Sequence, residues 1–268
     1  MKGWRSEAVE IHRPQVALKL DPYWLGAWLG DGTSLYGQIT SADPEIPARI
    51  ASAGFEVKNS DVEHYRWSVY GLRRWLTRLG LSPTKRIPGA YQRATVAERM
   101  ALLQGIVDTD GHVSAQNGSV EVCLCDRDLS YDVYELACGL GFKVFFRESD
   151  AKLNGRVVGR RWRIYWSPQG RQCAYLPRKA KALGTGQRTS RWRYIVACRP
   201  VESRPVQCIQ VDSPSHLYLA GKQLIPTHNS VVLLWEPLHQ IQIEHDRCLR
   251  RSDHEFPLQW GESSGWAL

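Results

Sequence analysis

Residues 25–32 read LGAWLGDG, and residues 103–111 read LQGIVDTDG. Both stretches are mainly apolar, both end in Asp-Gly, and their final aspartates, Asp31 and Asp110, stand 79 positions apart. Two similar segments separated by the length of one small structural unit predict an internal repeat. The rest of the predicted fold extends outward from these two segments.

Each segment lies in a predicted helix with a defined start. Asp21 is a suitable N-cap, Pro22 fits the first helical position, and Gly30 and Gly32 end the helix. The second helix begins at Thr95-Val-Ala-Glu98, the sequence of a capping box. It also ends in an acid followed by glycine, so the two helices are expected to be equivalent.

The segments that follow the two helices are also alike. After the first, the pattern predicts strands over 35–40 and 63–70 and a helix over 71–80. After the second, it predicts a hairpin around Asn117-Gly118, a helix over Asp128–Gly139, and strands near 143–148 and 157–166 joined through Asn154-Gly155. The expected fold class is therefore α+β, a pseudo-dimer whose two units each run helix, hairpin, helix, hairpin.

Small residues on the two helices predict that they pack closely. Gly26 and Gly30 lie four positions apart on one helical face, and Gly105 and Thr109 repeat this spacing. Small residues let two helix backbones approach each other, so the C-terminal carboxylates of Asp31 and Asp110 would meet. Two like charges at short range are unfavourable unless a divalent cation accompanies them, and oxygen ligands favour Mg²⁺.

The charge of the chain points to a polyanionic partner. The 268 residues carry a formal net charge of +8, with a pI near 9.2. Residues 147–193 contain thirteen basic residues, two acids and five interleaved aromatic residues. Such a mixture suits nucleic acid better than a membrane surface. No apolar run reaches the length of a membrane span, and seven cysteines without a CxxC pair argue against a disulfide framework, so we expect a cytoplasmic protein.

Four motifs over roughly residues 20–167 resemble the intein-borne LAGLIDADG homing endonucleases. Two are the paired helices quoted above. The third is Lys85-Arg-Ile-Pro88, which is similar to the basic segment these enzymes carry ahead of their second helix, and the fourth is the LACGLGFK stretch over 136–143. Each motif is weak alone, whereas four in the right order are specific. The resemblance implies αββαββα repeats with two saddle-shaped sheets, each lying in a DNA major groove.

The resemblance also implies site residues and a cofactor. Asp31 and Asp110 would be the catalytic, metal-binding acids of a Mg²⁺-dependent enzyme that cuts double-stranded DNA as a monomer. Lys85 would support the transition state, although a solvated loop lysine is an equally good interpretation. The predicted DNA-binding residues are Arg147, Arg161, Arg163 and Tyr165, of which the last three alternate to one face of a strand. A plain surface strand is the alternative.

A second unit, over about 195–230, resembles the C-terminal splicing motifs of inteins and would form strands of a Hint-type domain. It ends in Thr227-His-Asn-Ser230. The side-chain amide of Asn229 can attack its own carbonyl, and His228 can supply the proton that the leaving amine needs. Ser230, whose hydroxyl can receive an acyl group, would be the first residue of the C-terminal host segment.

One departure from most inteins concerns Cys208, which stands where an acid is usual. Together with Thr227 it resembles the variant class that attacks the upstream junction with an internal cysteine, although a buried structural cysteine is a serious alternative. Residues 1–20 lack the N-terminal splicing motifs. We therefore expect the chain to be a fragment that needs an N-terminal intein fragment in trans.

The predicted organisation has five parts. Residues 1–20 are a residual linker, 21–167 the endonuclease, 168–194 a basic connector, 195–229 the splicing segment, and 230–268 the start of the host protein. Ser230 followed by four apolar residues fits the end of a phosphate-binding loop, so this tail is expected to be an ATPase fragment. Two alternatives stay open: a LAGLIDADG relic that binds nucleic acid without cutting, and a splicing-only fragment.

Overall fold

The computed structural model describes residues 4–5, 7–10, 17–33, 36–60, 65–183, 192–194, 197, 199–203, 205, 209, 211–212 and 214–228. Cys208, Asn229, Ser230 and the predicted host segment lie outside the described residues. None of the described helices is long and apolar enough to cross a membrane.

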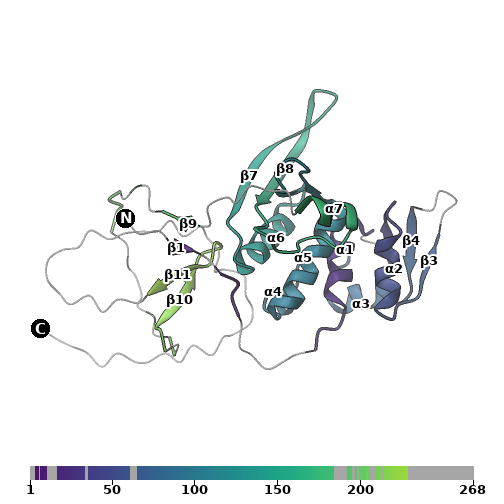
Figure 1. Cartoon of the computed structure of the whole chain (residues 1–268), viewed down its shortest axis with the longest axis horizontal. Helices are drawn as coiled ribbons and strands as arrows, with labels where there is room; N and C mark the ends of the chain where they lie inside the picture. Colours follow the sequence, from purple (N-terminus) through teal and green to yellow (C-terminus); the bar gives the residue numbers. More distant parts are fainter. Residues whose placement is uncertain are drawn as a thin grey trace, which may run out of the picture.

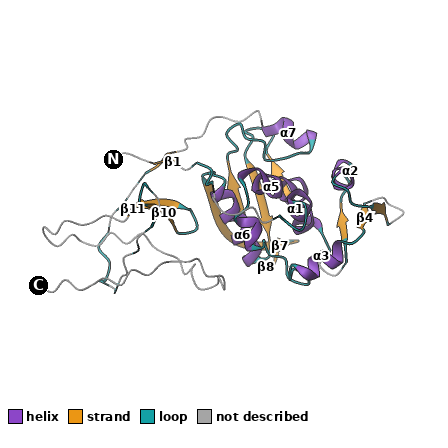
Figure 2. Cartoon of the chain, turned by 90° about the horizontal axis from the view of Figure 1, so that it is seen from below, coloured by secondary structure: helices purple, strands orange, loops and turns teal. Residues whose placement is uncertain are grey.

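Two helices lie side by side among the other helices of the chain (Figures 1 and 2). Helix α1 spans Pro22–Asp31 and helix α5 spans Val96–Asp110. The predicted caps are confirmed: the Asp21 carboxylate accepts from the Trp24 amide, and Thr95 and Glu98 form a reciprocal capping box. Each cap satisfies amides that the first helical turn leaves without a partner, which fixes where each helix begins.

The two helices touch backbone to backbone, as the small residues predict. A Cβ atom added to Gly26 would lie 2.1 Å from the carbonyl oxygen of Leu102, and one added to Gly105 would lie 2.1 Å from that of Tyr23. A Cβ on Gly30 would lie 2.0 Å from the Thr109 hydroxyl oxygen. At Gly26 and Gly105 the atoms in the way belong to the backbone of the other helix, so a side chain fits there only if the helices move apart.

Each central helix is followed by an antiparallel sheet, and the two sheets have the same strand order. After α5 come β5 (Gly111–Val113), β6 (Val120–Leu124), α6 (Arg127–Gly139), β7 (Val144–Leu153) and β8 (Arg156–Trp166), with sheet order β5-β6-β8-β7. After α1 come β2 (Gln38–Thr40), α2 (Glu45–Ser52), β3 (Val57–Asn59), β4 (Arg66–Val69) and α3 (Leu72–Arg78), with order β2-β4-β3. In the first unit, a single β-bridge between Gly32 and Ile39 takes the place that the β5–β6 pairing has in the second unit. The first unit is therefore a shortened copy of the second.

The predicted hairpins and helices agree with these elements, with differences in extent. Gly118 adopts a positive φ of 64° in the first hairpin, and Asn154 and Gly155 do so in the long one. The structure adds elements that the patterns did not predict, among them α2, β3, the short α4 (Gly89–Gln92), and α7 (Pro177–Leu183) within the predicted connector. Short helices without a long apolar face leave little periodicity in the sequence.

The remaining strands pair outside these two units (Figure 1). β1 (Trp4–Arg5) pairs with β9 (Trp192–Arg193), and β10 (Leu217–Ala220) pairs with β11 (Ile225–His228), both antiparallel. Strands were expected over about 195–230; β10 and β11 lie in that range, whereas its described residues before Leu217 are not in strands. The Hint-type assignment of β10 and β11 stays a prediction.

The close approach of α1 and α5 makes a prediction about folding. Replacing Gly105 with alanine should lower the free energy of unfolding by about 1–3 kcal/mol, because the backbones must separate to admit the methyl group. This loss should outweigh the roughly 1 kcal/mol by which alanine favours a helix over glycine. Gly159→Ala is the control, since nothing lies within 4 Å of its added Cβ. Urea unfolding that finds both variants equally stable would contradict the packing described here.

Candidate functional site

The packing of the two helices brings their terminal aspartates together. Asp31 is the last residue of α1 and Asp110 the last residue of α5. Burial raises the pKa of Asp110 above its ordinary value, and the negative charge of Asp31 raises it further. Partial burial likewise raises the pKa of Asp31, although part of this residue reaches solvent. The two carboxylates therefore share one electrostatic environment at one end of the helix pair.

Two lysines lie beside these acids. The Lys85 ammonium donates to the carbonyl oxygen of Gly30 at 2.8 Å and lies 5.4 Å from the centroid of the Trp28 ring. Lys179 donates to the carbonyl oxygens of Val107, Asp108 and Gly111, each at 2.7 Å. Each lysine therefore binds the C-terminal carbonyls of one helix, where a cation is favourable.

The lysines and the acids shift each other's protonation equilibria. Both lysines lower the pKa values of both aspartates, against the larger effect of burial on those carboxyls. Burial in turn lowers the pKa of Lys85 and of Lys179. Two acids and two cations in one partly buried cluster are typical of a functional site. Sequence reasoning found Lys85 through its motif and missed Lys179, which stands in the predicted connector.

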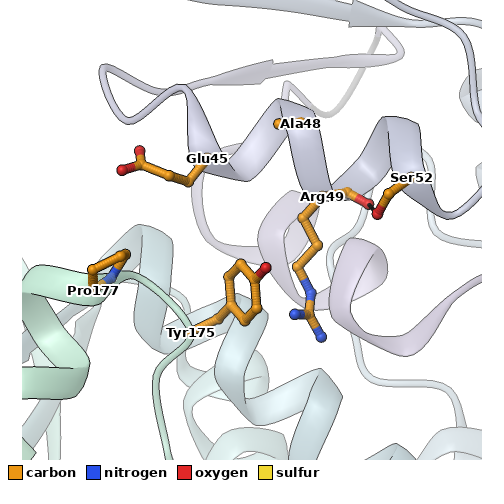
Figure 3. Close-up of a pocket in the computed structure, with 6 residues that line it drawn as sticks. All are labelled: Glu45, Ala48, Arg49, Ser52, Tyr175 and Pro177. Atoms are coloured by element: carbon orange, nitrogen blue, oxygen red, sulfur yellow. Dashed lines mark hydrogen bonds between the residues drawn. The ribbon is translucent and has the colours of Figure 1, made fainter.

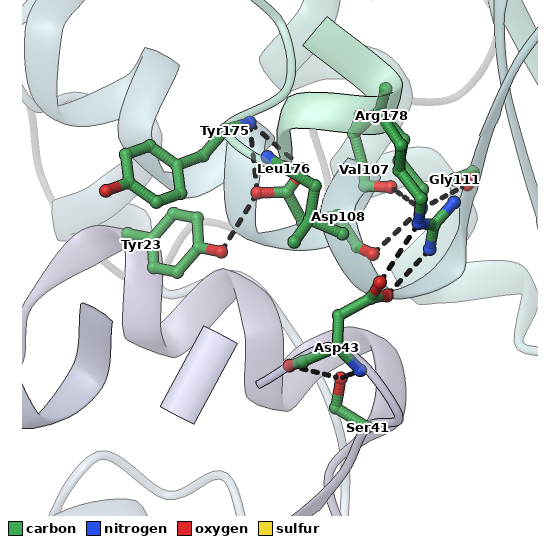
Figure 4. A network of polar contacts seen from close by, with 10 residues as sticks. Tyr23, Ser41, Asp43, Val107, Asp108, Gly111, Tyr175, Leu176 and Arg178 are labelled. Atoms are coloured by element: carbon green, nitrogen blue, oxygen red, sulfur yellow. Dashed lines mark hydrogen bonds and ion pairs between the residues drawn. The ribbon is translucent and has the colours of Figure 1, made fainter. Parts of the chain in front are cut away.

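The residues just before α7, the helix that carries Lys179, are held by the buried Asp108 of α5 (Figure 4). The Asp108 carboxylate accepts from the Tyr23 hydroxyl at 2.9 Å and from the backbone amides of Tyr175 and Leu176 at 3.0–3.1 Å. These bonds attach the start of α7 to the end of α5. Asp108 has no counterpart in α1, where Leu29 occupies the equivalent position, so this attachment is specific to the second unit.

The start of α7 also contacts the first unit. The Arg49 guanidinium of α2 lies between the rings of Tyr23 and Tyr175, at 4.3 and 3.8 Å from their centroids, and lines a shallow pocket with Tyr175 (Figure 3). Arg178 forms a two-pronged ion pair with Asp43, at 2.7 and 3.0 Å. The helix that carries Lys179 is thus fixed to both units.

Lys85 is held in place through its neighbour in the basic motif. Arg86 donates two hydrogen bonds to the carboxylate of Asp132 on α6, at 2.6 and 2.9 Å, and the Ile87 amide donates to the same carboxylate at 3.0 Å. Asp132 is buried. The motif therefore binds α6 through Arg86 and Ile87, and this contact keeps Lys85 beside the acids.

The predicted DNA-binding residues lie on one face of the four-stranded sheet. Along β8, Trp162, Ile164 and Trp166 are buried, whereas the alternate residues Arg161, Arg163 and Tyr165 lie on the opposite face. Arg147 of β7 is the register partner of Arg163 and lies on that same face. The long β7–β8 hairpin extends beyond the helices (Figure 1).

Arg163 is held by an acid of the neighbouring strand, whereas Arg161 donates to the hydroxyl of Ser149 at 3.2 Å. Arg163 binds the Glu121 carboxylate of β6 with two hydrogen bonds of 2.7 Å, and this guanidinium lowers the pKa of Glu121. Glu121, Arg147, Arg163 and Tyr165 together line a hollow of about 230 Å³ on the sheet face. A ligand that used Arg163 fully would have to compete with Glu121.

The splicing residues are described only in part. Thr227 stands opposite Tyr218 in the β10–β11 pair, and its hydroxyl donates to the carbonyl oxygen of Ile225 at 3.1 Å. His228 is the last residue of β11. The predicted roles of these residues, and those of Cys208, Asn229 and Ser230, stay predictions.

Asp31 and Asp110 are the two carboxylates that this end of the helix pair offers to a metal ion. No group of three or more His, Cys, Asp or Glu side chains that could hold a metal ion occurs among the described residues. Mg²⁺ is commonly bound by one or two carboxylates, with water and substrate phosphate oxygens as the remaining ligands. Two carboxylates close enough for the charge of Asp31 to raise the pKa of Asp110 fit that mode of binding.

Comparison with known proteins found relatives over most of the chain. The replicative DNA helicase DnaB of Mycobacterium intracellulare is 38% identical over 256 residues, which are 93% of this chain and 41% of that protein. The iron-sulfur cluster assembly SufBD family protein ML0593 of Mycobacterium leprae is 29% identical over 167 residues, 54% of this chain and 19% of that protein. The chain thus spans about two fifths or less of the length of these relatives. No protein-family model matches it.

Solved structures of homing endonuclease I-DmoI are also similar to the chain. A complex with DNA and Ca aligns with 61% of this chain and 95% of that chain, at 14% identity and a TM-score of 0.41. Mesophilic variants of the same enzyme align with 62% of this chain, at 15% identity and a TM-score of 0.39.

The raised pKa of Asp110 makes a prediction about stability. A carboxyl whose pKa is raised in the folded state stabilises the fold below its unfolded pKa, and this contribution is lost as the pH rises through the folded pKa. Asp110→Asn should therefore melt at a higher temperature than the parent protein at pH 7 without divalent ions. The advantage should vanish below the ordinary value of 3.8.

Divalent cations should reverse this difference, because Mg²⁺ should raise the melting temperature of the parent protein more than that of Asp110→Asn. Glu56→Gln, a carboxylate-to-amide change at an exposed ion pair with Lys58, should have little effect under either condition. A variant Asp110→Asn that melts below the parent protein at pH 7 would mean that the carboxylate makes a net favourable contact with the lysines.

Proposed function

We propose that this chain is a LAGLIDADG-type homing endonuclease carried within an intein, and that it makes a Mg²⁺-dependent double-strand break in DNA. The observation that carries the proposal is the meeting of Asp31 and Asp110, flanked by Lys85 and Lys179, at the ends of two helices packed on glycine. Each unit of the pseudo-dimer contributes one acid and binds one lysine. A single chain therefore carries both halves of the site, and we propose that it acts as a monomer.

The chain's own groups have separable roles in this proposal. Asp31 and Asp110 would hold the cation, one from each helix. Bound Mg²⁺ supplies the charge that activates water and stabilises the leaving oxygen of a phosphodiester. Lys85 and Lys179, fixed by backbone carbonyls, would offset the charge of the acids and of the scissile phosphate.

The outer face of the four-stranded sheet would contact the duplex. Arg147, Arg161 and Tyr165 would reach DNA directly, and Arg163 would do so in competition with Glu121. The basic residues of 147–193 give this part of the chain the charge that phosphate contacts require.

The comparisons support an inserted element. The alignments to the helicase and to the iron-sulfur assembly protein must overlap on this chain, since they cover 93% and 54% of it. One segment shared by proteins with two unrelated names is typical of an element that moves between host genes. We infer that the host of this copy is a DnaB-type replicative helicase, which agrees with the ATPase start predicted for the tail from Ser230.

The nuclease proposal predicts that Asp110→Asn abolishes cleavage and leaves DNA binding largely intact. The substrate is a plasmid with the uninterrupted coding sequence of the host helicase, incubated in Mg²⁺ with and without EDTA. Glu56→Gln should cut as the parent protein does, because this exposed carboxylate is outside the site. Full cutting by Asp110→Asn, or cutting that survives EDTA, would overturn the assignment. A parent protein that binds and never cuts would favour the non-cleaving relic.

We also propose that the C-terminal part cleaves the chain at Asn229. The side-chain amide nitrogen of Asn229 attacks its own carbonyl carbon and forms a succinimide. The bond to Ser230 breaks, and His228 protonates the released amine. With an N-terminal intein fragment in trans, Cys208 would attack the upstream junction and Thr227 would assist.

This second activity predicts that the purified chain releases a peptide beginning at Ser230, detectable by mass spectrometry. Release should be absent in Asn229→Ala and slower in His228→Ala, whereas Asn117→Ala, in a distant hairpin turn, should release at the parent rate. An N-terminal intein fragment should accelerate release and yield a branched product that Cys208→Ala suppresses. A chain that stays whole even with that fragment present would leave the nuclease alone as the function.

A further inference from the structure

The end of helix α6 is the place where three separate segments of the chain meet. Residues 7–10 reach it through the Val9 amide, which donates to the carbonyl oxygen of Gly139 at 2.9 Å. Strand β9 reaches it through the carbonyl oxygen of Trp192, which accepts from the Lys143 ammonium at 3.0 Å. The third segment is the turn between β10 and β11, residues 221–224. All three lie against the stretch over 136–143 that the sequence analysis singled out.

The turn of the β10–β11 hairpin contacts α6 through a cation. The Lys222 ammonium lies 3.4 Å from the centroid of the Tyr131 ring. That ring is itself stacked on Phe146 of β7, with centroids 4.7 Å apart. The positive charge of Lys222 also lowers the pKa of Glu135, one turn along α6, against the larger effect of burial.

Two further contacts fix the same turn. The buried Arg193 donates to the carbonyl oxygen of Gln223 at 3.3 Å and to that of Phe142 at 3.1 Å, so it joins the turn to the residues after α6. The side chains of Gln223 and Tyr134 are also hydrogen-bonded. The turn is thus held by the Tyr131 ring, the Arg193 guanidinium and the Tyr134 hydroxyl.

We infer that α6 is a docking platform for the β10–β11 hairpin, and that Tyr131, Tyr134 and Arg193 are positioning residues for the cleavage site that follows β11. A two-stranded hairpin alone is marginally stable in water, so β11 needs such support to stay ordered. Strand β11 ends at His228, one residue before Asn229. This inference rests on the proposed cleavage at Asn229, and it makes that reaction depend on a helix of the endonuclease unit.

The experiment compares Lys222→Ala, Tyr131→Ala and the conservative Lys222→Arg and Tyr131→Phe. Hydrogen exchange at the amides of β10 and β11 measures docking, and the rate of peptide release from Ser230 measures positioning. Both alanine variants should lose most of the exchange protection and release the peptide about tenfold more slowly, because cyclisation needs the reacting atoms held in line. The conservative variants should keep both properties, since an arginine over a ring and a phenylalanine under a cation preserve the contact.

Lys58→Ala is the matched control. Its ammonium lies 5.1 Å from the Tyr70 ring on a different sheet, so it should change neither exchange in β10–β11 nor release. Thermal unfolding should remain unchanged for Lys222→Ala, which excludes a general loss of folding. Alanine variants that keep full protection, or that lose protection and still release the peptide at the parent rate, would overturn the inference. A parent chain whose β10–β11 amides are protected but which never releases a peptide would refute the proposed cleavage and the positioning role. In that case the exchange rates of the alanine variants would still test whether the hairpin docks on α6.

Discussion

The contact between the backbones of α1 and α5 at Gly26 and Gly105 is the constraint on which the rest of the structure depends. A Cβ at either position would meet a carbonyl oxygen of the other helix at 2.1 Å. Because the helices touch at this level, their last residues, Asp31 and Asp110, meet as well. The same contact joins the two copies of the repeat into one core, in which Trp24, Trp28, Leu102 and Ile106 are almost fully buried.

This packing creates an electrostatic problem that other residues offset. Acids at the C-terminal end of a helix oppose the helix dipole, and Asp31 and Asp110 also repel each other. Lys85 and Lys179 bind the carbonyl groups at the same helix ends and bring positive charge beside the acids. The remaining unfavourable energy, visible in the raised pKa values of both aspartates, is what a divalent cation would relieve. A site that is destabilised when empty binds its cation more strongly.

Local patterns predicted much of this fold, and long-range contacts account for what they missed. The caps at Asp21 and Thr95 and the turns at Gly118 and Gly155 depend on residues close in sequence, so helix starts and hairpins were predictable. Asp31 and Asp110 were predictable as a pair because they occupy the same position in the two copies of the repeat. Lys179 was not, since its place depends on Asp108, some seventy positions away, binding the amides of Tyr175 and Leu176. The pairing of Arg163 with Glu121 and the docking of β10–β11 on α6 are likewise contacts across the fold that no periodicity reports.

The most direct test of the account is the position of the metal. Crystals of the protein bound to a duplex carrying the uninterrupted host sequence, soaked in Mn²⁺, would give an anomalous difference map. The account predicts density between the carboxylates of Asp31 and Asp110, within about 2.0–2.4 Å of an oxygen from each, with a phosphate oxygen of the duplex as a further ligand. Density bound to other side chains, with these two aspartates left without metal, would contradict it.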